Sequence, residues 1–505
     1  MRTTKTTRRE VLLAATGVLA AATLPIARAP MSRAQPSADV VIIGSGYAGA
    51  VTALRLAQRG ISCIVLERGR RWPITAVGNT FATAVNPDTR ALWLPGVATG
   101  VLEVVAGSGI NCFAGAGVGG GSLVNYTVMM TPEEDLFAAS FGDRLDYDEM
   151  ISHWYPRARD LIGCSPIPDD VLAAEQYSAA RGFDEVSRRA GLEVRRVPMA
   201  TDWDVVRDEI HGRIGPSATV GDCIFGVNSG AKLSVDRTIL SAAEATGLVT
   251  VLPLHSVTDV RAEGDRYTLT CAVLDASGQT RYTTEFHSNT VVFAAGSVGT
   301  SKLLVRARAR GDLPHLSTDV GGYWGSSGDH VTLRLGRTAD GQGGPAHIVA
   351  LDWHSGATPT TLLNFPLGVP VLGGLSQNAL AVSITPPSGS LVYDTAMDQV
   401  ELRWPTDVPE IARVTKDIGT ILAKIGAVSS GSAPALALPT VTSHPLGGAV
   451  LGTVTDSYGR IGEHPGLYVA DSSLIPGSTG AVPPALTVTA LADRCASALV
   501  ADLTR

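Results

Sequence analysis

The first residues able to carry chemistry form a Gly-x-Gly-x-x-Gly pattern over residues 44–49. In such a pattern Gly44 allows a tight turn, Gly46 lets the backbone approach a pyrophosphate, and Gly49 lets a helix pack closely on a strand. Glu67 follows Gly49 by 18 residues, near the spacing at which a carboxylate accepts hydrogen bonds from a ribose. The pattern predicts a dinucleotide site, and by itself it does not separate FAD from NAD.

A second glycine-rich segment, residues 115–121, has five glycines in seven positions. So many glycines carry a large entropy cost, which a ligand or a packed backbone must offset. A flexible linker would not continue into Leu-Val-Asn125 and the apolar residues 128–130. We therefore expect this segment to lie against a flat cofactor ring.

His444 stands in a short Ser-His-Pro-Leu-Gly-Gly segment, residues 443–448. Proline and the glycine pair predict a rigid loop, and histidine is the side chain best suited to exchange protons near neutral pH. Alone, such a histidine is more often structural. Because the same chain also carries two glycine-rich motifs typical of cofactor binding, His444 is the candidate proton acceptor.

Near the C-terminus, residues 466–471 form an apolar strand pattern that ends in Asp471. This carboxylate is able to accept a hydrogen bond from a ribityl or phosphate group, and a simple turn residue is the alternative. Residues 483 and 484 are prolines that precede a predicted helix over 485–494. The N-terminus of that helix would stabilise negative charge on a reduced flavin ring.

The elements that must position these residues are also visible. Residues 40–43 are an apolar run typical of a buried parallel strand. A helix is predicted over 50–59, and a second strand over 63–66 ends at Glu67. Together these elements predict a complete βαβ unit around the first glycine motif. The chain of 505 residues is long enough for two domains.

The composition describes a globular chain, with 45% hydrophobic and 17% charged residues. The net charge is −7, and a nucleic-acid partner would call for a basic surface patch. We therefore expect no nucleic-acid partner. The six cysteines are widely spread and form no Cys-x-x-Cys pair, so we expect no metal site. One disulfide stays open as an alternative to six buried thiols.

The N-terminus carries the pair Arg8-Arg9 followed by an apolar run over residues 11–26. This pattern predicts a twin-arginine signal peptide over residues 1–34, and hence a secreted or periplasmic protein. A membrane anchor is the alternative, but the run is short and only weakly apolar. No later segment has 18 charge-free apolar residues, so we expect no membrane span in the mature chain and at most a transient contact with a membrane surface.

Six segments together resemble the glucose–methanol–choline (GMC) oxidoreductase family, and within it the bacterial cholesterol oxidases that hold FAD non-covalently. The similarity runs from about residue 40 to residue 500. The segments are GSGYAGAVTALRL, GVGGGSLVN, GAKLSVDRT, AAGSVGTSKLLVRAR, SHPLGG and LYVADSSLIPGS.

The resemblance implies FAD rather than NAD, and an α/β architecture that is α+β overall. A Rossmann-type FAD domain would comprise residues 38–160, 225–310 and 440–505. A substrate domain with a large, mainly antiparallel sheet would comprise 161–224 and 311–439. No histidine precedes the second glycine segment, so we expect FAD to be non-covalent.

The resemblance also distributes roles among residues. Val257 would contact adenine through its backbone, and Asn125 would touch the flavin. Trp353 and His354 would line the substrate cavity. The residues expected at the cofactor are Gly44, Gly46, Tyr47, Gly49, Glu67, Gly115, Gly119, Gly120, Gly121, Ser122, Asn125, Val257, Gly296, Asp471, Ser472, Pro484 and Ala485, and those expected at the substrate are Val128, Met130 and Phe365.

Three positions are expected at the reacting centre: His444, Asn364 and Pro483. In the family, the histidine that His444 matches positions the substrate hydroxyl and helps remove its proton. Asn364 stands where cholesterol oxidases have a glutamate that shuttles the proton whose transfer moves the double bond from the 5,6 to the 4,5 position, and an amide lacks the basicity for this. Pro483 replaces an asparagine and offers neither an N–H nor an amide side chain.

The resemblance therefore implies an FAD-dependent oxidation of a secondary alcohol on a bulky, sterol-like substrate. Oxygen is the expected acceptor, giving hydrogen peroxide, and double-bond isomerisation is expected to be absent or weak. Two alternatives stay open: a tailoring alcohol oxidoreductase acting on a polyketide or terpenoid, and a flavin-containing binding protein without redox activity. We expect a monomer.

Overall fold

The computed structural model describes residues 38–335, 341–345, 347–364, 366, 368, 376–429, 436–438 and 441–505. The predicted signal peptide, residues 1–34, lies outside the described residues and stays a prediction. Within the described part, no helix is both long and apolar enough to cross a membrane. All six cysteines lie within the described residues as free thiols, and all except Cys164 are buried.

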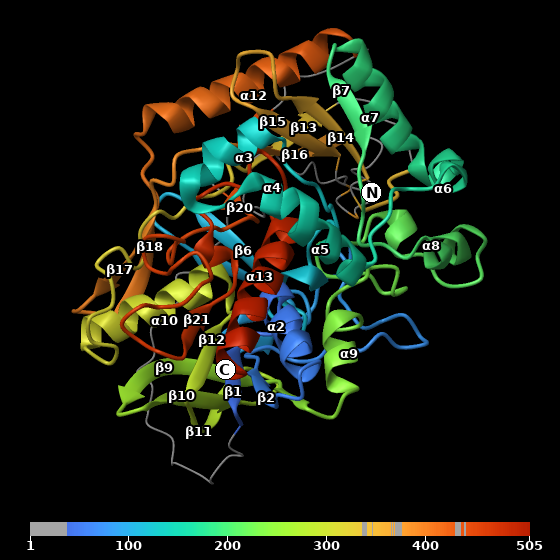
Figure 1. The fold of residues 1–505 in the computed structure, drawn as a ribbon. Helices are drawn as coiled ribbons and strands as arrows, with labels where there is room; N and C mark the ends of the chain where they lie inside the picture. The colour runs from blue at the N-terminus through green and yellow to red at the C-terminus, as the bar shows by residue number, and fades with distance from the viewer. Residues whose placement is uncertain are drawn as a thin grey trace, which may run out of the picture.

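A five-stranded parallel sheet forms the lower half of the molecule in Figure 1. Its inner strands are fully buried runs of mainly β-branched residues, as expected for strands covered on both faces. The strand order is β21 (Leu467–Val469), β12 (Thr290–Phe293), β1 (Val40–Ile43), β2 (Cys63–Leu66) and β8 (Val249–Leu252). The expected Rossmann-type βαβ unit is therefore present at β1 and β2.

Helix α2 (Tyr47–Ala57) connects β1 to β2 and begins three residues before the predicted start at residue 50. Gly46 is its N-cap, so the glycine motif itself starts the helix. Helix α13 (Ala485–Leu503) packs beside α2 at the centre of the molecule (Figure 1) and is longer than the predicted 485–494. Most of its residues are buried, so tertiary packing extends it.

A buried charge cluster fixes this helix pair. The Asp493 carboxylate on α13 is fully buried and accepts hydrogen bonds from Arg55 on α2 and from Arg157 on α5 (Tyr155–Ile162). Each guanidinium contacts both carboxylate oxygens, the geometry that planar arginine favours. These ion pairs thus fix α2, the helix that the glycine motif starts, relative to the C-terminal helix α13.

A six-stranded antiparallel sheet forms the upper half, as the resemblance implied. Helix α12 (Pro409–Ala427) lies across one of its faces in Figure 1. His330 and Asp352 of the sheet contact Thr415 and Lys424 of α12, which identifies the face that α12 covers. The strand order is β19 (Leu436–Leu438), β13 (His330–Leu335), β16 (Ser376–Ser383), β15 (Thr360–Asn364), β14 (Ile348–Asp352) and β7 (Glu193–Arg196).

Smaller sheets and helices complete the described fold. The remaining strands are β3 (Trp93–Leu94), β4 (Ala98–Thr99), β5 (Leu102–Ala106), β6 (Asn111–Gly115), β9 (His255–Glu263), β10 (Arg266–Leu274), β11 (Thr280–Ser288), β17 (Ser390–Asp394), β18 (Gln399–Arg403) and β20 (Val441–Thr442). The remaining α-helices are α3 (Glu134–Phe141), α4 (Tyr147–Glu149), α6 (Asp169–Ala173), α7 (Ser178–Arg189), α8 (Trp203–Ile210), α9 (Ile239–Glu244) and α10 (Gly296–Arg310). Short turns of other helix types are η1 (Gly120–Leu123), η2 (Gly142–Arg144), η3 (Met150–Trp154), η4 (Glu175–Tyr177), η5 (Ala218–Val220) and η6 (Ser472–Leu474).

Candidate active site

Glu67 directly follows β2 and is almost completely buried. One carboxylate oxygen accepts hydrogen bonds from the backbone N–H and the hydroxyl of Ser45, at 3.1 and 2.7 Å. Among the described residues, the other accepts only from the Gly69 backbone N–H, at 2.8 Å, so it keeps a lone pair for a ribose hydroxyl. Val257 lies on β9, whose first residue, His255, donates to the Glu67 carbonyl. The two residues predicted at the adenosine end therefore come from neighbouring strands.

The two glycine-rich motifs lie against each other. A Cβ atom added to Gly120 would stand 2.8 Å from the Gly46 Cα atom, and one added to Gly49 would stand 2.0 Å from the Gly44 carbonyl oxygen. Neither approach leaves room for a side chain. Residues 120–123, predicted as part of a loop, form the short helix η1, and the Ser122 hydroxyl ties it to the Gly119 carbonyl.

Space and free donors remain on the open side of these motifs. A Cβ on Gly46 would have only the Gly120 Cα within 4 Å, at 3.8 Å, and Cβ atoms on Gly121 and Gly296 would contact nothing. Helix α2 has no side-chain cap and no acidic residue in its first turn. Its N-terminal N–H groups are thus available to a phosphate. The residues present fit a dinucleotide pyrophosphate.

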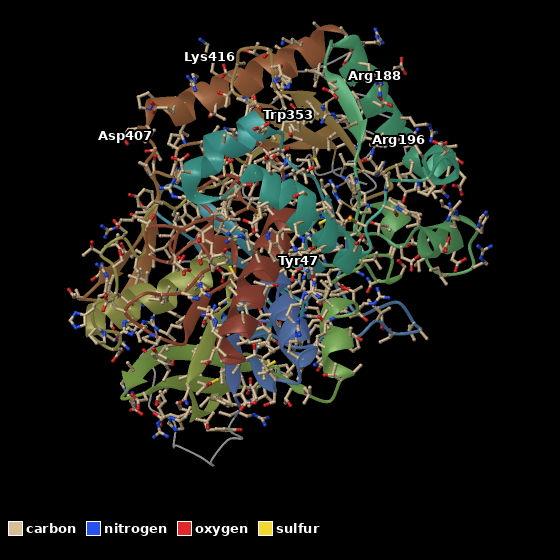
Figure 2. All side chains as sticks on the ribbon, in the orientation of Figure 1. Tyr47, Arg188, Arg196, Trp353, Asp407 and Lys416 are labelled. Carbon is tan, nitrogen blue, oxygen red and sulfur yellow. The ribbon has the colours of Figure 1, made fainter. Side chains whose placement is uncertain are left out.

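Tyr47 and Asn125 meet at the centre of the molecule, where Figure 2 places Tyr47 between the two sheets. The Asn125 amide donates a hydrogen bond of 2.8 Å to the Tyr47 hydroxyl. Burial raises the pKa of Tyr47 well above its ordinary value, so the phenol stays protonated. This hydrogen bond therefore joins Tyr47 of the first glycine motif to the residues that directly follow the second glycine-rich segment.

Lys232 is a residue of this region that the sequence reasoning did not assign. Its ammonium group is buried and donates to the carbonyls of Leu123 and Asn125, each at 2.7 Å, and of Cys223 at 3.2 Å. Burial lowers the pKa of Lys232 to about 8. Lys232 lies within GAKLSVDRT, one of the six segments that carry the family resemblance. Its place in that segment was the sequence signal that could have identified it.

Asp471 follows β21 by two residues. Both oxygens of its carboxylate accept hydrogen bonds from protein donors. One oxygen accepts from the Gly296 N–H and the Thr300 hydroxyl, and the other from the N–H and hydroxyl of Ser473. Ser472 accepts from the Ser297 N–H at 3.0 Å. The structure therefore gives Asp471 four protein donors, and its carboxylate joins η6 to the start of α10 rather than standing free for a cofactor group.

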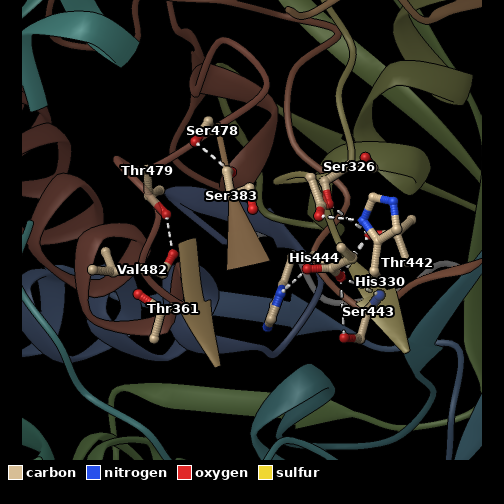
Figure 3. Close-up of polar contacts among 12 residues, drawn as sticks. Ser326, His330, Thr361, Ser383, Thr442, Ser443, His444, Ser478, Thr479 and Val482 are labelled. Carbon is tan, nitrogen blue, oxygen red and sulfur yellow. Dashed lines mark hydrogen bonds and ion pairs between the residues drawn. The ribbon is translucent and has the colours of Figure 1, made fainter. Parts of the chain in front are cut away.

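His444 is paired with a carboxylate that the sequence reasoning missed. Its Nδ1 atom lies 2.8 Å from Oδ1 of Asp329, the residue before β13. The Asp329 side chain is 0% exposed and that of His444 is 15% exposed. Figure 3 shows His444 gathered with Thr442, Ser443 and Ser326 beside the start of this strand. No sequence spacing connects residues 115 positions apart, so only the fold reveals this pair.

The second oxygen of Asp329 is also satisfied. It accepts from the Ser443 N–H at 2.9 Å, the Thr442 hydroxyl at 3.0 Å and the Ser443 hydroxyl at 3.3 Å. The His444 N–H donates in turn to the Thr442 hydroxyl. Among the described residues His444 Nε2 has no hydrogen-bond partner, so this nitrogen is the one presented to a substrate.

Asn364 does not lie where the resemblance placed it. It is paired with Ala379 on β16, and successive residues of a strand point to opposite faces. Asn364 therefore shares the face of Leu362, whose neighbour across the strands, Ala381, is paired with His330. This is the face that α12 covers. Leu363 lies on the opposite face of β15.

The face of β15 that α12 leaves uncovered, which we call the inner face, meets the segment before α13. The Thr361 hydroxyl donates to the Ala481 carbonyl at 2.6 Å and accepts from the Trp353 indole at 3.0 Å. Figure 3 shows Thr361 beside Val482, whose carbonyl accepts from Thr479. Pro483 lies in this buried segment.

The N-terminus of α13 follows directly. Pro484 is its N-cap and Ala485 its first residue. The helix has no side-chain cap and no acidic residue in its first turn. Its free N–H groups and positive end therefore suit a negatively charged flavin ring.

The residues predicted at the substrate separate into two groups. Val128 and Met130 are buried in the same apolar cluster as Leu363 and Val482. Trp353 is buried, but His354 is exposed and paired with Glu133 at 2.9 Å, so it points away from the core. Phe365 lies outside the described residues.

Comparisons with known proteins agree with this geometry. Residues 391–492 match the model of the GMC oxidoreductase C-terminal region, and residues 39–85 match that of FAD dependent oxidoreductases. These stretches contain the His444 loop and the first glycine motif. The chain is therefore similar to GMC oxidoreductases and to FAD dependent oxidoreductases.

The matches to curated relatives cover nearly the whole length of this chain. A cholesterol oxidase of Mycobacterium tuberculosis is 29% identical over 92% of this chain and 91% of its own. Paromamine 6'-oxidase of Streptomyces fradiae is 25% identical over 92% of each chain. The solved structure of pyridoxine 4-oxidase from Mesorbium loti shares the fold, with a TM-score of 0.65 at 18% identity over 92% of this chain and 99% of its own.

The cofactor is FAD, and the chain is an FAD-dependent oxidoreductase that is similar to GMC alcohol oxidoreductases. The open glycines, the acceptor on Glu67 and the uncapped helices α2 and α13 are the groups that would hold its ribose, pyrophosphate and flavin ring. Strand β6, which leads into the second glycine segment, carries no histidine, in agreement with non-covalent FAD.

Proposed function

We propose that this protein oxidises a secondary alcohol on a bulky, hydrophobic, sterol-like substrate and uses oxygen as the final acceptor. The observation that carries the proposal is the Asp329–His444 pair, which leaves Nε2 as an open proton acceptor. A binding protein without redox activity has no need of an oriented imidazole. The cholesterol oxidase relatives support the substrate class.

The chain's own residues would act as follows. His444 Nε2 takes the hydroxyl proton of the alcohol while the carbinol carbon becomes a carbonyl carbon. When bound, FAD supplies the acceptor for the carbinol hydride. The uncapped N-terminus of α13 stabilises the negative charge that this transfer brings. Val128 and Met130 pack behind the apolar part of the substrate, excluding water.

The inner face of β15 carries Thr361 and Leu363, and neither has a titratable group. Thr361 is already engaged with Ala481 and Trp353. Asn364, on the other face, has no useful basicity either. A steroid oxidised here would therefore keep its double bond in the 5,6 position.

The test is to mix the yellow holoenzyme anaerobically with sterols and with polyketide and terpenoid alcohols. We expect the flavin absorbance to bleach with a bulky hydrophobic secondary alcohol, and the colour to return with hydrogen peroxide on admitting air. Cholesterol should give the unconjugated ketone. Smooth conversion to cholest-4-en-3-one, or bleaching only by compact polar alcohols, would contradict the proposal.

We also propose that the protein is exported by the twin-arginine route. The support is the Arg8-Arg9 pair and the apolar run that follows it. Replacing both arginines by lysine should hold the enzyme inside the cell, and unchanged export would contradict this assignment.

A further inference from the structure

We propose that Asp329 is a positioning residue that fixes the proton of neutral His444 on Nδ1, so that Nε2 presents its lone pair to the substrate hydroxyl. The inference rests on the proposed function and deepens it, because it explains how His444 becomes a base. Histidine has two ring nitrogens, and the partner of one decides which of them carries the proton.

The hydrogen-bond partners of Asp329 all donate. An ionised carboxylate only accepts, so the 2.8 Å contact with Oδ1 requires a proton on Nδ1 of His444. On the other oxygen, the backbone N–H of Ser443 is a donor that no rotation can reverse. The surroundings of Asp329 therefore suit a carboxylate, which can accept from every neighbour at once.

The neighbouring His330 shows the contrast. Both of its nitrogens are engaged, Nδ1 with the Gly328 carbonyl and Nε2 with the Thr415 hydroxyl of α12. The two neighbours have different partners, since His330 contacts α12 and Asp329 contacts the His444 loop. A histidine with a structural role is thus adjacent in sequence to the residue that holds the reactive histidine.

The exchange Asp329→Asn should reverse the tautomer rather than merely weaken the contact. The Ser443 N–H needs an acceptor, so the amide oxygen must take the place of Oδ2. The amide NH₂ then faces His444 and donates to Nδ1, which moves the proton to Nε2. In serine proteases the same exchange behind the catalytic histidine costs about 10⁴-fold in kcat for this reason.

The direct test is ¹⁵N NMR of histidine-labelled FAD holoenzyme, recorded where the imidazole is neutral, with the His444 signals assigned by their loss in His444→Gln. We expect the Nδ1–H form in the wild type and the Nε2–H form in Asp329→Asn. The control is Asp352→Asn, a buried aspartate on the α12 side of the sheet, which should leave the Nδ1–H form unchanged. An Nε2–H form in the wild type would overturn the inference even where the variant fails to fold, and so would an Nδ1–H form in Asp329→Asn.

A kinetic test follows with any alcohol that bleaches the flavin. Asp329→Asn should lower kcat by about 10² to 10⁴-fold, the range for loss of a general base, with a much smaller change in KM. A kcat within twofold of the wild type would overturn the inference. If no alcohol bleaches the flavin, the proposed function fails, and the NMR result still decides the role of Asp329.

Discussion

The Thr361 hydroxyl donates a hydrogen bond of 2.6 Å to the main-chain carbonyl of Ala481. It joins the inner face of the antiparallel sheet to the segment that leads into α13. Ala481 has a φ of 57°, a left-handed conformation that costs energy for any residue other than glycine. Thr361 therefore helps to hold a strained backbone at the junction between the substrate side and the flavin side.

Replacing Thr361 by valine keeps the shape of the side chain and removes its hydroxyl. Two buried groups, the Ala481 carbonyl and the Trp353 indole N–H, would then lose their partner. We expect the free energy of unfolding in denaturant to fall by about 1–3 kcal/mol. Thr361→Ser, which keeps the hydroxyl, should recover most of the loss, and an equal loss in both variants would argue against this role.

The positions of Leu363 and Asn364 predict unequal effects on catalysis. Leu363→Ala removes apolar surface from the inner face, so kcat/KM for a bulky alcohol should fall by at least about tenfold. Asn364→Ala changes the face under α12 and should have a much smaller effect. Steady-state kinetics of the two variants decide between the faces, and a larger loss in Asn364→Ala would return that residue to the active site.

The case of Asn364 shows where sequence reasoning stopped. Glycine patterns are local, so the βαβ unit, the first glycine motif and Glu67 were predictable from spacing alone. A strand offers no such landmark, and a shift of one residue moves a side chain to the other face. Phe365, beside it, lies outside the described residues and stays a prediction.

Asp329 and Lys232 were missed for a different reason. Both act on partners about 100 or more residues away in the sequence, and no periodicity connects such positions. The helix bounds differed because packing extends helices beyond their local signals, as at α13. The predicted domain boundaries, the monomeric state and the roles of the site residues stay predictions.

Lys232 predicts a defect in cofactor binding. Lys232→Met keeps the length of the side chain but leaves the buried carbonyls of Leu123 and Asn125 without their donor. The flavin-facing segment should loosen, and FAD affinity should fall by about tenfold, equivalent to about 1.4 kcal/mol. Titration of apoprotein with FAD by fluorescence measures this, with Lys302→Met, which changes a half-buried lysine of α10, as the control. Equal affinity in wild type and Lys232→Met would contradict the prediction.

Asp493 predicts a loss of stability. Asp493→Asn leaves Arg55 and Arg157 without their shared carboxylate, and we expect unfolding to become easier by about 3 kcal/mol. This value is the lower end of the free-energy cost of breaking a buried ion pair. We expect the lower end because both arginines keep some access to water. Denaturant unfolding of the two proteins at neutral pH measures the difference.

The ion pairs of Asp493 with Arg55 and Arg157 also predict how the stability changes with pH. Burial alone would raise the pKa of Asp493, but its hydrogen bonds with Arg55 and Arg157 hold that pKa below its ordinary value of 3.8. The stabilisation is therefore fully present above about pH 5 and is lost as the pH falls through the folded-state pKa. The difference between wild type and Asp493→Asn should shrink below pH 4. A difference that grew on acidification would show that the carboxylate is not the stabilising form.

His444 carries the central claim that this enzyme removes a hydroxyl proton with an oriented imidazole while FAD accepts the hydride. The most direct measurement is the rate of anaerobic flavin bleaching in a single turnover, comparing wild type with His444→Gln at saturating alcohol. The glutamine amide has no basicity, so the rate should fall by about 10² to 10⁴-fold while the yellow, FAD-bound form is retained. A rate within threefold of the wild type, with FAD still bound, would contradict the account.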